Sequence, residues 1–501
     1  MPTIIAGSTP QTITLPEGRI LNVSGATGTT GTLYRLDPVL GGTNSLQSWP
    51  IGAGAMAPIG PYAGQQRFLV SCSVGIVDIG TGSGAVGAVQ SVMLANGLSI
   101  MGDSYAANNY GGALNNFVST QTSGIIVTAD ELLGGVFDIN QMVAIGGKSA
   151  REMLTEQLPA VLLRRNRYVY LSAGYNDIYG TDNATGQAAA AFVIQIIQAL
   201  IANGQIPIWH TVGARTYSAS KIAGHMACNA ALRDFARANA CGVFLDLFMI
   251  TVDPITPPGA LSVRSGWTLD GVNHWNLLAA YYASKALAVR LRPLIQLPNQ
   301  LPAGSEDSAT SPATNTLKNV IFAGSSGTFG ANITGPVPTN WDVSWATRTG
   351  TGVANVSVVD IVDADTGLVT ARGLTVALSS GATAAGDVLS ISQNDGVTPI
   401  VAGQLISAAA RLSLASPSFV NEATIRAQAN VNESTWAGNN AAKSGAGSNP
   451  DYPESATFTR RTRRIAALVT GTITKFDARI SFSGPATSGS YTLSQPRLRK
   501  D

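Results

Sequence analysis

Between about residue 95 and residue 297, short apolar segments alternate with longer segments of helical composition. This alternation predicts parallel strands joined by crossover helices, because strands that are buried on both faces are apolar throughout. The predicted strands are 98–101, 142–145, 168–172, 206–211 and 243–247, and the predicted helices are 188–202, 219–240 and 277–291. We therefore expect an α/β domain of three layers over residues 93–297.

The regions on either side have a different pattern. Their strand-like runs are short and are separated by Gly, Pro and Asn, as in all-β folds. We predict a small all-β domain at 1–92 and a jelly-roll-like β-sandwich at 317–501. Residues 298–316, rich in Pro, Ser, Ala and Asn, are predicted to form a linker. A multidomain chain is also expected from the length of 501 residues, because single cores usually stop growing below that size.

Charge and composition argue against several functions. Only 12% of the residues are charged and the net charge is +2, so we expect no nucleic-acid partner. No apolar run reaches about 18 residues, and the N-terminus lacks the basic and apolar regions of a signal peptide. We expect neither membrane insertion nor Sec export. With three histidines and no zinc-like spacing of ligands, we also predict no metal and no cofactor.

Ser104 follows the first predicted strand of the α/β region, in the sequence Gly102-Asp103-Ser104. Open α/β sheets bind their ligands in the crevice beyond the carboxyl ends of the strands. Gly102 permits a sharp turn there, so Ser104 could present both its hydroxyl and its backbone N–H to the crevice. By itself, Gly-Asp-Ser also fits an ordinary turn or a helix cap.

Two further strand ends carry hydrogen-bond donors. Gly146 and Gly147 follow the second predicted strand, and Asn176 follows the third. Donors on neighbouring strand ends can form an oxyanion hole. His274 precedes the last helix, with Asp270 close by in sequence, and these residues supply a base and a carboxylate.

In this order, the motifs resemble those of the SGNH (GDSL-like) hydrolases. The matching blocks are Gly102-Asp103-Ser104, Gly147, Gly174-Tyr175-Asn176-Asp177 and Asp270 with His274. The resemblance covers about residues 95 to 297 and implies a serine esterase. Ser104 resembles the nucleophile and His274 the base. The N–H groups of Ser104 and Gly147 and the side-chain amide of Asn176 resemble the oxyanion hole.

One feature departs from the family pattern. Three residues separate Asp270 from His274, whereas the family usually has two. A one-residue bulge would restore Asp270 as the carboxylate of the triad. Otherwise, a backbone carbonyl or another acid such as Asp253 would orient His274.

Aromatic residues of the C-terminal region stand in polar sequence surroundings, which suit exposed faces that stack on sugar rings. The candidates for substrate binding are Trp341, Trp345, Trp436 and Tyr452. Packing or a trimer interface is the alternative for this region. The basic cluster at 460–464 favours a solvated edge or a subunit contact over a site for an acidic glycan.

The N-terminal region resembles small β modules of bacteriophage tail proteins, through segments such as 15–19 and 59–62. This resemblance implies a tail spike or tail fibre that removes acetyl groups from a bacterial surface polysaccharide. The 1–92 domain would then serve virion attachment or module packing, with other tail proteins as partners and a homotrimer as one arrangement. Two alternatives remain: a secreted bacterial carbohydrate esterase with a binding module, and a non-catalytic tail protein that binds a glycan receptor.

Overall fold

The computed structural model describes a large part of the chain. The described residues are 3–5, 11–15, 19–25, 30–36, 45–51, 54–55, 66–74, 76–83, 94–107, 117–120, 124–180, 184–215, 219–239, 242–255, 262–268, 275–295, 315–362, 367–394, 402–430, 433–438, 451–462, 465–466 and 475–500. The chain divides into two compact units. One unit consists of 1–95, 165–167 and 199–206, and the other of 96–164, 168–198 and 207–501.

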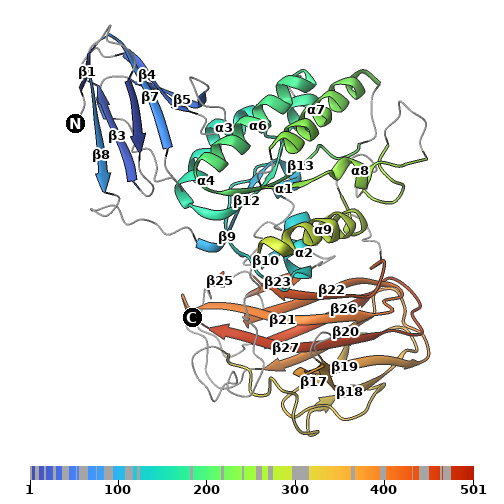
Figure 1. Ribbon diagram of the computed structural model, residues 1–501. Coiled ribbons are helices and arrows are strands. Elements are labelled where there is room, and N and C mark those ends of the chain that lie inside the picture. The colour runs from blue at the N-terminus through green and yellow to red at the C-terminus, as the bar shows by residue number, and fades with distance from the viewer. Residues whose placement is uncertain are drawn as a thin grey trace. The chain divides into compact units, whose positions relative to one another are not determined.

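The N-terminal strands form two antiparallel sheets of four strands each, shown in blue in Figure 1. The first has the order β1 (Thr3–Ile5), β8 (Ile76–Ser83), β3 (Arg19–Gly25) and β6 (Gly54–Ala55). The second has the order β2 (Gln11–Leu15), β7 (Gln66–Val74), β4 (Thr30–Leu36) and β5 (Ser45–Ile51). The strand content expected for this region is therefore present, while the domain boundary at residue 92 stays a prediction.

The α/β region contains the expected parallel sheet of five strands. Its order is β11 (Asp138–Met142), β9 (Leu94–Gly102), β12 (Asn166–Ser172), β13 (Ile206–His210) and β14 (Val243–Leu245). Two predicted strands differ from the observed ones. β11 begins before the predicted 142–145 and ends at Met142. β14 ends at Leu245 because the Asp246 side chain caps the helix that follows.

Helices lie on both sides of this sheet (Figure 1). They are α1 (Ser104–Ala107), α2 (Ile125–Leu132), α3 (Ala150–Glu156), α4 (Leu158–Arg164), α5 (Tyr175–Tyr179), α6 (Gly186–Ala202), α7 (Ala219–Ala238), α8 (Leu247–Thr251), α9 (Leu277–Leu291) and the 3₁₀ helix η1 (Arg292–Leu294). Within the described residues, none of the helices is both long and apolar enough to cross a membrane.

Side-chain caps define where two of these helices begin. Ser149 and Glu152 form a capping box at the start of α3, in which each side chain bonds the backbone N–H of the other residue. Asn276 caps α9 by accepting the N–H groups of Leu278 and Ala279. Both helices therefore begin at a defined residue directly after a segment that carries a predicted catalytic block.

The C-terminal region is a β-sandwich. One sheet has the order β10 (Phe117–Thr120), β23 (Glu433–Gly438), β22 (Val420–Asn430), β26 (Lys475–Phe482), β20 (Val388–Asn394), β17 (Asp342–Thr347) and β15 (Thr328–Phe329). The other has the order β16 (Ile333–Thr334), β18 (Val353–Val362), β19 (Val369–Ser380), β27 (Ser490–Lys500), β21 (Leu405–Ala415) and β24 (Ala456–Arg461), with β25 (Ile465–Ala466) paired to β21.

One strand of the sandwich comes from the α/β part of the chain. β10 lies in sequence between Ser104 and α2, yet it pairs in parallel with the edge strand β23, where Ser119 is opposite Trp436. Sequence analysis did not anticipate this pairing. Outside the predicted range 317–501, Thr316 also bonds a sandwich strand, since its N–H donates to the carbonyl of Leu498. The boundaries of the predicted linker and sandwich stay a prediction.

The basic cluster at 460–464 includes two arginines that join the sandwich to the α/β part. Arg460 is fully buried, with its guanidinium 3.8 Å from Glu131 of α2. Arg461 forms an ion pair of 3.0 Å with Asp130 and also donates to the Phe137 carbonyl. The predicted solvated edge or subunit contact is thus wrong for these two residues. Arg463 and Arg464 lie outside the described residues.

Candidate active site

Ser104 lies directly after β9, at a turn that only glycine can make. Gly102 has a φ of +140°, and a Cβ there would lie 2.2 Å from the carbonyl oxygen of Ser172. The side-chain amide of Gln157 holds the same residue from the other side. It accepts the Gly102 N–H at 2.8 Å and donates to the Gly102 carbonyl at 3.0 Å. The strand end that presents Ser104 is therefore fixed by contacts from two other parts of the chain.

Asp103 joins β9 to β12. Its N–H donates to the Ser172 carbonyl at 3.1 Å, and its carboxyl accepts both the Ser172 hydroxyl and the Tyr105 N–H at 3.0 Å. The residue is buried, and this burial raises the pKa of the Asp103 carboxyl to about 7. Asp103 thus acts as a structural link, while the neighbouring Ser104 is partly exposed.

The segment after β11 lies beside Ser104. The Ile145 N–H donates to the Gly102 carbonyl at 3.0 Å, and a Cβ built on Gly146 would lie 3.7 Å from the Cβ of Ser104. Gly147 has a φ of +84°, which brings the chain through a turn toward α3. The structure therefore places the two-glycine segment next to Ser104, with Gly146 in direct contact. The assignment of the Gly147 N–H to the oxyanion hole stays a prediction.

Asn176 lies beside the same segment. It is the second residue of α5, after Gly174 with a φ of +96°, and its amide donates to the Lys148 carbonyl at 3.0 Å. A side-chain amide has two N–H groups, so this bond leaves one for an oxyanion. Asp177 strengthens the connection, because its carboxylate accepts the N–H of Ala150 at 2.7 Å. The ends of β9, β11 and β12 are thus held together with their predicted donors.

His274 and Asp270 lie outside the described residues, but both flanks of their segment are described. Thr268 pairs with Trp275, and the Asn276 N–H donates to the Trp267 carbonyl at 3.1 Å. The indole of Trp275, the residue after His274, lies with its centroid 5.4 Å from the ring of Tyr105, the residue after Ser104. The chain neighbours of the predicted base and of the predicted nucleophile are therefore in contact.

The other two histidines are structural. His210 bonds the Thr211 carbonyl through Nδ1 at 2.8 Å and the Tyr170 hydroxyl through Nε2 at 3.2 Å. His225 likewise bonds a backbone carbonyl with one ring nitrogen and a tyrosine hydroxyl with the other. Burial lowers the pKa of each imidazole to about 4. Each ring is therefore neutral near pH 7, with both nitrogens engaged in structural bonds.

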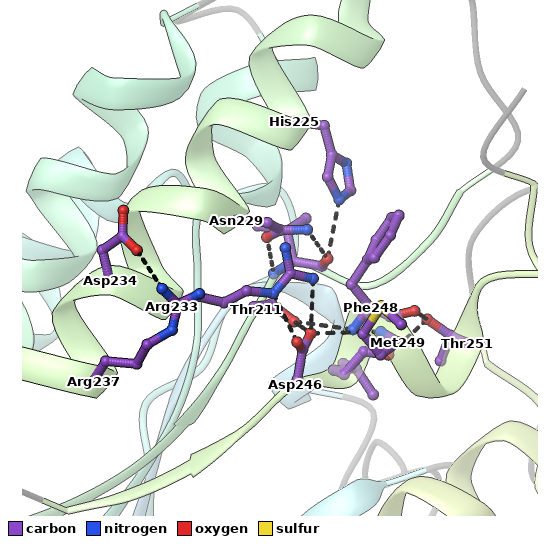
Figure 2. A network of polar contacts seen from close by, with 12 residues as sticks. Thr211, His225, Asn229, Arg233, Asp234, Arg237, Asp246, Phe248, Met249 and Thr251 are labelled. Atoms are coloured by element: carbon purple, nitrogen blue, oxygen red, sulfur yellow. Dashed lines mark hydrogen bonds and ion pairs between the residues drawn. The ribbon is translucent and has the colours of Figure 1, made fainter. Parts of the chain in front are cut away.

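A polar network, shown in Figure 2, holds the loop that follows β13. Asn229 of α7 bonds both the N–H and the carbonyl of Val212, at 2.8 and 2.9 Å. Arg233 forms two bonds to Asp246, at 2.7 and 3.0 Å, and Asp246 also accepts the Thr211 hydroxyl. The network fixes Thr211 and Val212, and the next residue, Gly213, lies against the indole of Trp275. Sequence analysis missed these residues, because they are brought together from α7, β13 and α8.

The aromatic residues predicted to bind substrate do not have the exposed faces expected of them. Trp341, Trp436 and Tyr452 are all at most 5% exposed, and Trp345 is partly buried. Trp341 packs in the sandwich core and donates its indole N–H to the Asn319 carbonyl at 2.7 Å. The prediction of exposed stacking faces is therefore wrong for the three buried residues. Trp341 and Tyr452 belong to the core of the sandwich, and the Trp436 ring is covered by the guanidinium groups of Arg426 and Arg479.

Comparisons with known proteins were made at the levels of sequence and of structure. No family model and no curated protein matches the sequence. The structural neighbours are GDSL-type acylhydrolases and esterases, together with a phage tailspike domain. The TM-scores of these neighbours lie under 0.5.

Three neighbours illustrate the range. A GDSL-like lipase from Bacteroides thetaiotaomicron is 17% identical, with a TM-score of 0.30 over 40% of this chain and 88% of the other. An acetyl-xylooligosaccharide esterase mutant from Geobacillus stearothermophilus is 13% identical, with a TM-score of 0.31 over 40% of this chain and 95% of the other. The enzymatically active domain of tailspike protein 4 from bacteriophage CBA120 is 13% identical, with a TM-score of 0.23 over 41% of this chain and 22% of the other.

Proposed function

We propose that this chain is a serine carboxylic-ester hydrolase of the SGNH (GDSL-like) type. The observation that carries the proposal is the convergence of four segments at the carboxyl edge of the sheet. The turn of Ser104 is in contact with Gly146, the amide of Asn176 bonds the same segment at Lys148, and Trp275 contacts Tyr105. The Ser104 hydroxyl thus lies beside several N–H donors, and His274 directly precedes Trp275 in the sequence. A nucleophile, oxyanion donors and a base in one place suit acyl transfer.

In the proposed mechanism, the Ser104 hydroxyl attacks the ester carbonyl carbon while His274 takes its proton. The N–H groups of Ser104 and Gly147 and the amide of Asn176 stabilise the oxyanion of the tetrahedral intermediate. His274 then protonates the departing alcohol, which leaves an acyl group on Ser104. Water, activated by His274, releases this group as a carboxylic acid. Asp270, Asp253 or a backbone carbonyl orients the imidazole.

We propose an acetylated bacterial surface polysaccharide as the substrate and a phage tail spike or fibre as the setting. The low charged fraction of 12% and the two β-rich regions support this setting. A secreted bacterial carbohydrate esterase has the same site chemistry. A non-catalytic glycan receptor would retain the fold without turnover, so the catalytic test distinguishes it from both enzymes.

The test is hydrolysis of p-nitrophenyl acetate by the full chain and by single variants. Ser104→Ala and His274→Ala should each lower kcat by several orders of magnitude, because both residues act in one catalytic unit. Ser325→Ala, at an exposed serine of the C-terminal region, is the matched control and should leave the rate unchanged. Retention of more than about a tenth of the activity in the Ser104 or His274 variant would refute the assignment.

A further inference from the structure

Arg215 lies at the end of the loop that follows β13, and its guanidinium is placed over two tyrosine rings. Its central carbon is 4.7 Å from the ring centroid of Tyr179 and 5.3 Å from that of Tyr175. Both tyrosines belong to α5, the short helix that contains Asn176. The ring of Tyr175 lies 5.0 Å from that of Tyr105, so two ring contacts connect Arg215 to the residue next to Ser104. Arg215 therefore belongs to the surroundings of the proposed catalytic site.

The charge of Arg215 is not neutralised by a carboxylate of the described residues. The acids next to Ser104 and Asn176 in the chain are already engaged: Asp103 bonds Ser172 and Tyr105, and Asp177 accepts the Ala150 N–H at the start of α3. The glutamates of α3 pair with Lys148. A second cation, Lys221, donates to the Ile178 carbonyl of α5 at 2.8 Å. Two cations, Arg215 and Lys221, thus contact the helix that contains Asn176.

The geometry also defines what such a guanidinium can bind. A guanidinium has five N–H donors, and Arg215 directs one of them to the Tyr175 hydroxyl, which leaves other N–H groups in its plane for a ligand. These N–H groups form a fork that matches the two oxygens of a carboxylate. The partial burial of Arg215 reduces the screening of such a contact by solvent.

We propose that Arg215 is a specificity-determining residue that binds a carboxylate of the substrate, so that the ester is carried by an acidic glycan containing uronic acid residues. This proposal rests on the proposed esterase function and narrows its substrate class. The carboxylate would be held beside α5 while the acyl group lies at Ser104. A neutral acetylated sugar would lack this contact and would bind more weakly.

The experiment uses two small esters that differ only at the carboxyl group: acetylated methyl glucuronoside with a free carboxylate, and its uncharged primary amide of similar size. The wild-type chain should hydrolyse the acid with at least about a tenfold higher kcat/KM, as a charge-assisted pair implies. Arg215→Gln should raise KM for the acid by about 10- to 100-fold and leave kcat/KM for the amide within about twofold. The KM of Arg215→Lys for the acid should lie between the values of the wild-type chain and of Arg215→Gln. The lysine ammonium keeps the positive charge but lacks the two parallel N–H groups of the guanidinium.

The matched control is Arg290→Gln, at an exposed arginine of α9. This substitution should leave kcat/KM for both esters unchanged. Added salt should reduce the preference of the wild-type chain for the acid. Equal losses on both esters in Arg215→Gln would show a merely structural role and overturn the proposal. A wild-type chain without preference for the acid would also overturn it.

Binding separates this proposal from the proposed function. Calorimetry with the Ser104→Ala variant measures the affinity for each ester in the absence of turnover. Preferential binding of the acid that Arg215→Gln abolishes would support the role of Arg215 even if the wild-type chain hydrolysed neither ester. That absence of hydrolysis would refute the esterase function alone, whereas equal binding of acid and amide would refute the role of Arg215.

Discussion

At the scale of single residues, Gly213 and Trp275 determine how closely two loops of the proposed site approach one another. A Cβ built on Gly213 would lie 2.5 Å from Cζ2 of the Trp275 indole. The indole is 3% exposed and also contacts Tyr105. Since Trp275 directly follows His274, a displacement of the indole should displace the proposed base.

We predict that Gly213→Ala lowers kcat for p-nitrophenyl acetate by about 10²-fold, because a small misplacement of a catalytic group costs that much. Trp275→Phe lacks the indole atoms that the new methyl would meet, so the double variant should recover much of the lost activity. Steady-state kinetics of the two single variants and the double variant checks this. If the second substitution adds to the loss instead, the contact between Gly213 and Trp275 does not position the base.

Asn176 provides a second prediction at this scale. Asn176→Ala should lower kcat by about 10²- to 10³-fold with little change in KM, because an oxyanion donor acts mainly in the transition state. Asn203→Ala, at an amide in the turn after α6, is a control for the loss of a side-chain amide elsewhere. A change in KM alone would make Asn176 a residue that binds the ground state of the substrate.

At the scale of elements, the ends of β9 and β12 are joined through Asp103 and Ser172. The Asp103 N–H donates to the Ser172 carbonyl, and the Ser172 hydroxyl donates to the Asp103 carboxyl. Gly102 has no side chain, so the two strands can approach closely there. The link is buried, so the Asp103 carboxyl is favoured in its neutral form. The stability of this part of the sheet should therefore depend on pH.

The folded state raises the pKa of Asp103 from 3.8 to about 7, so its contribution to stability is fully present below the unfolded pKa and is lost as the pH rises through about 7. We predict that the free energy of unfolding falls between pH 4 and pH 8, by up to about 4 kcal/mol from this group. Asp103→Asn should remove that part of the slope, whereas Asp360→Asn at an exposed carboxylate should keep it. Urea unfolding at several pH values measures both slopes, and identical slopes in wild type and Asp103→Asn would contradict the prediction.

At the scale of the whole molecule, the α/β part and the sandwich are built as one unit. β10 extends a sandwich sheet, and Leu277 and Tyr281 of α9 belong to the hydrophobic cluster of the sandwich. The Tyr281 hydroxyl donates to Glu454 at 2.7 Å, and the ion pairs of Arg460 and Arg461 bind α2. A fragment of residues 93 to 300 would expose these surfaces, so its independent folding is not expected from the structure.

The buried pair of Arg460 and Glu131 tests this coupling. Arg460→Met should destabilise the chain by about 3 kcal/mol, because it leaves Glu131 buried without its cation. Arg237→Met removes an exposed pair with Asp234 and should cost less than about 1 kcal/mol. Thermal unfolding followed by tryptophan fluorescence compares the two variants. Equal stability of both would show that the Arg460 contact does not hold the parts together.

The prediction from sequence was most successful where the signal was local. Helix α9 has the predicted bounds, and the strands β9, β12 and β13 include most of the predicted residues, because apolar periodicity reports burial within one segment. Ser104 and Asn176 could be proposed as site residues because the segments that follow buried parallel strands lie at the carboxyl edge of the sheet. The buried position of Trp436 in β23 was missed, because polar sequence neighbours alternate to the other face of a strand and say little about burial.

The sequence by itself determined the parallel sheet, its helices and the order of the candidate catalytic blocks, since each depends on contacts within a short window or on a motif. Tertiary structure alone decided which distant groups hold those blocks in place. The Gln157 side chain hydrogen-bonds the backbone of Gly102, and the absence of a side chain at Gly213 leaves space for Trp275. Arg460 forms an ion pair with Glu131, more than three hundred residues earlier in the chain. Such partners are chosen by the packing of the folded chain, and a local sequence pattern carries no signal for them.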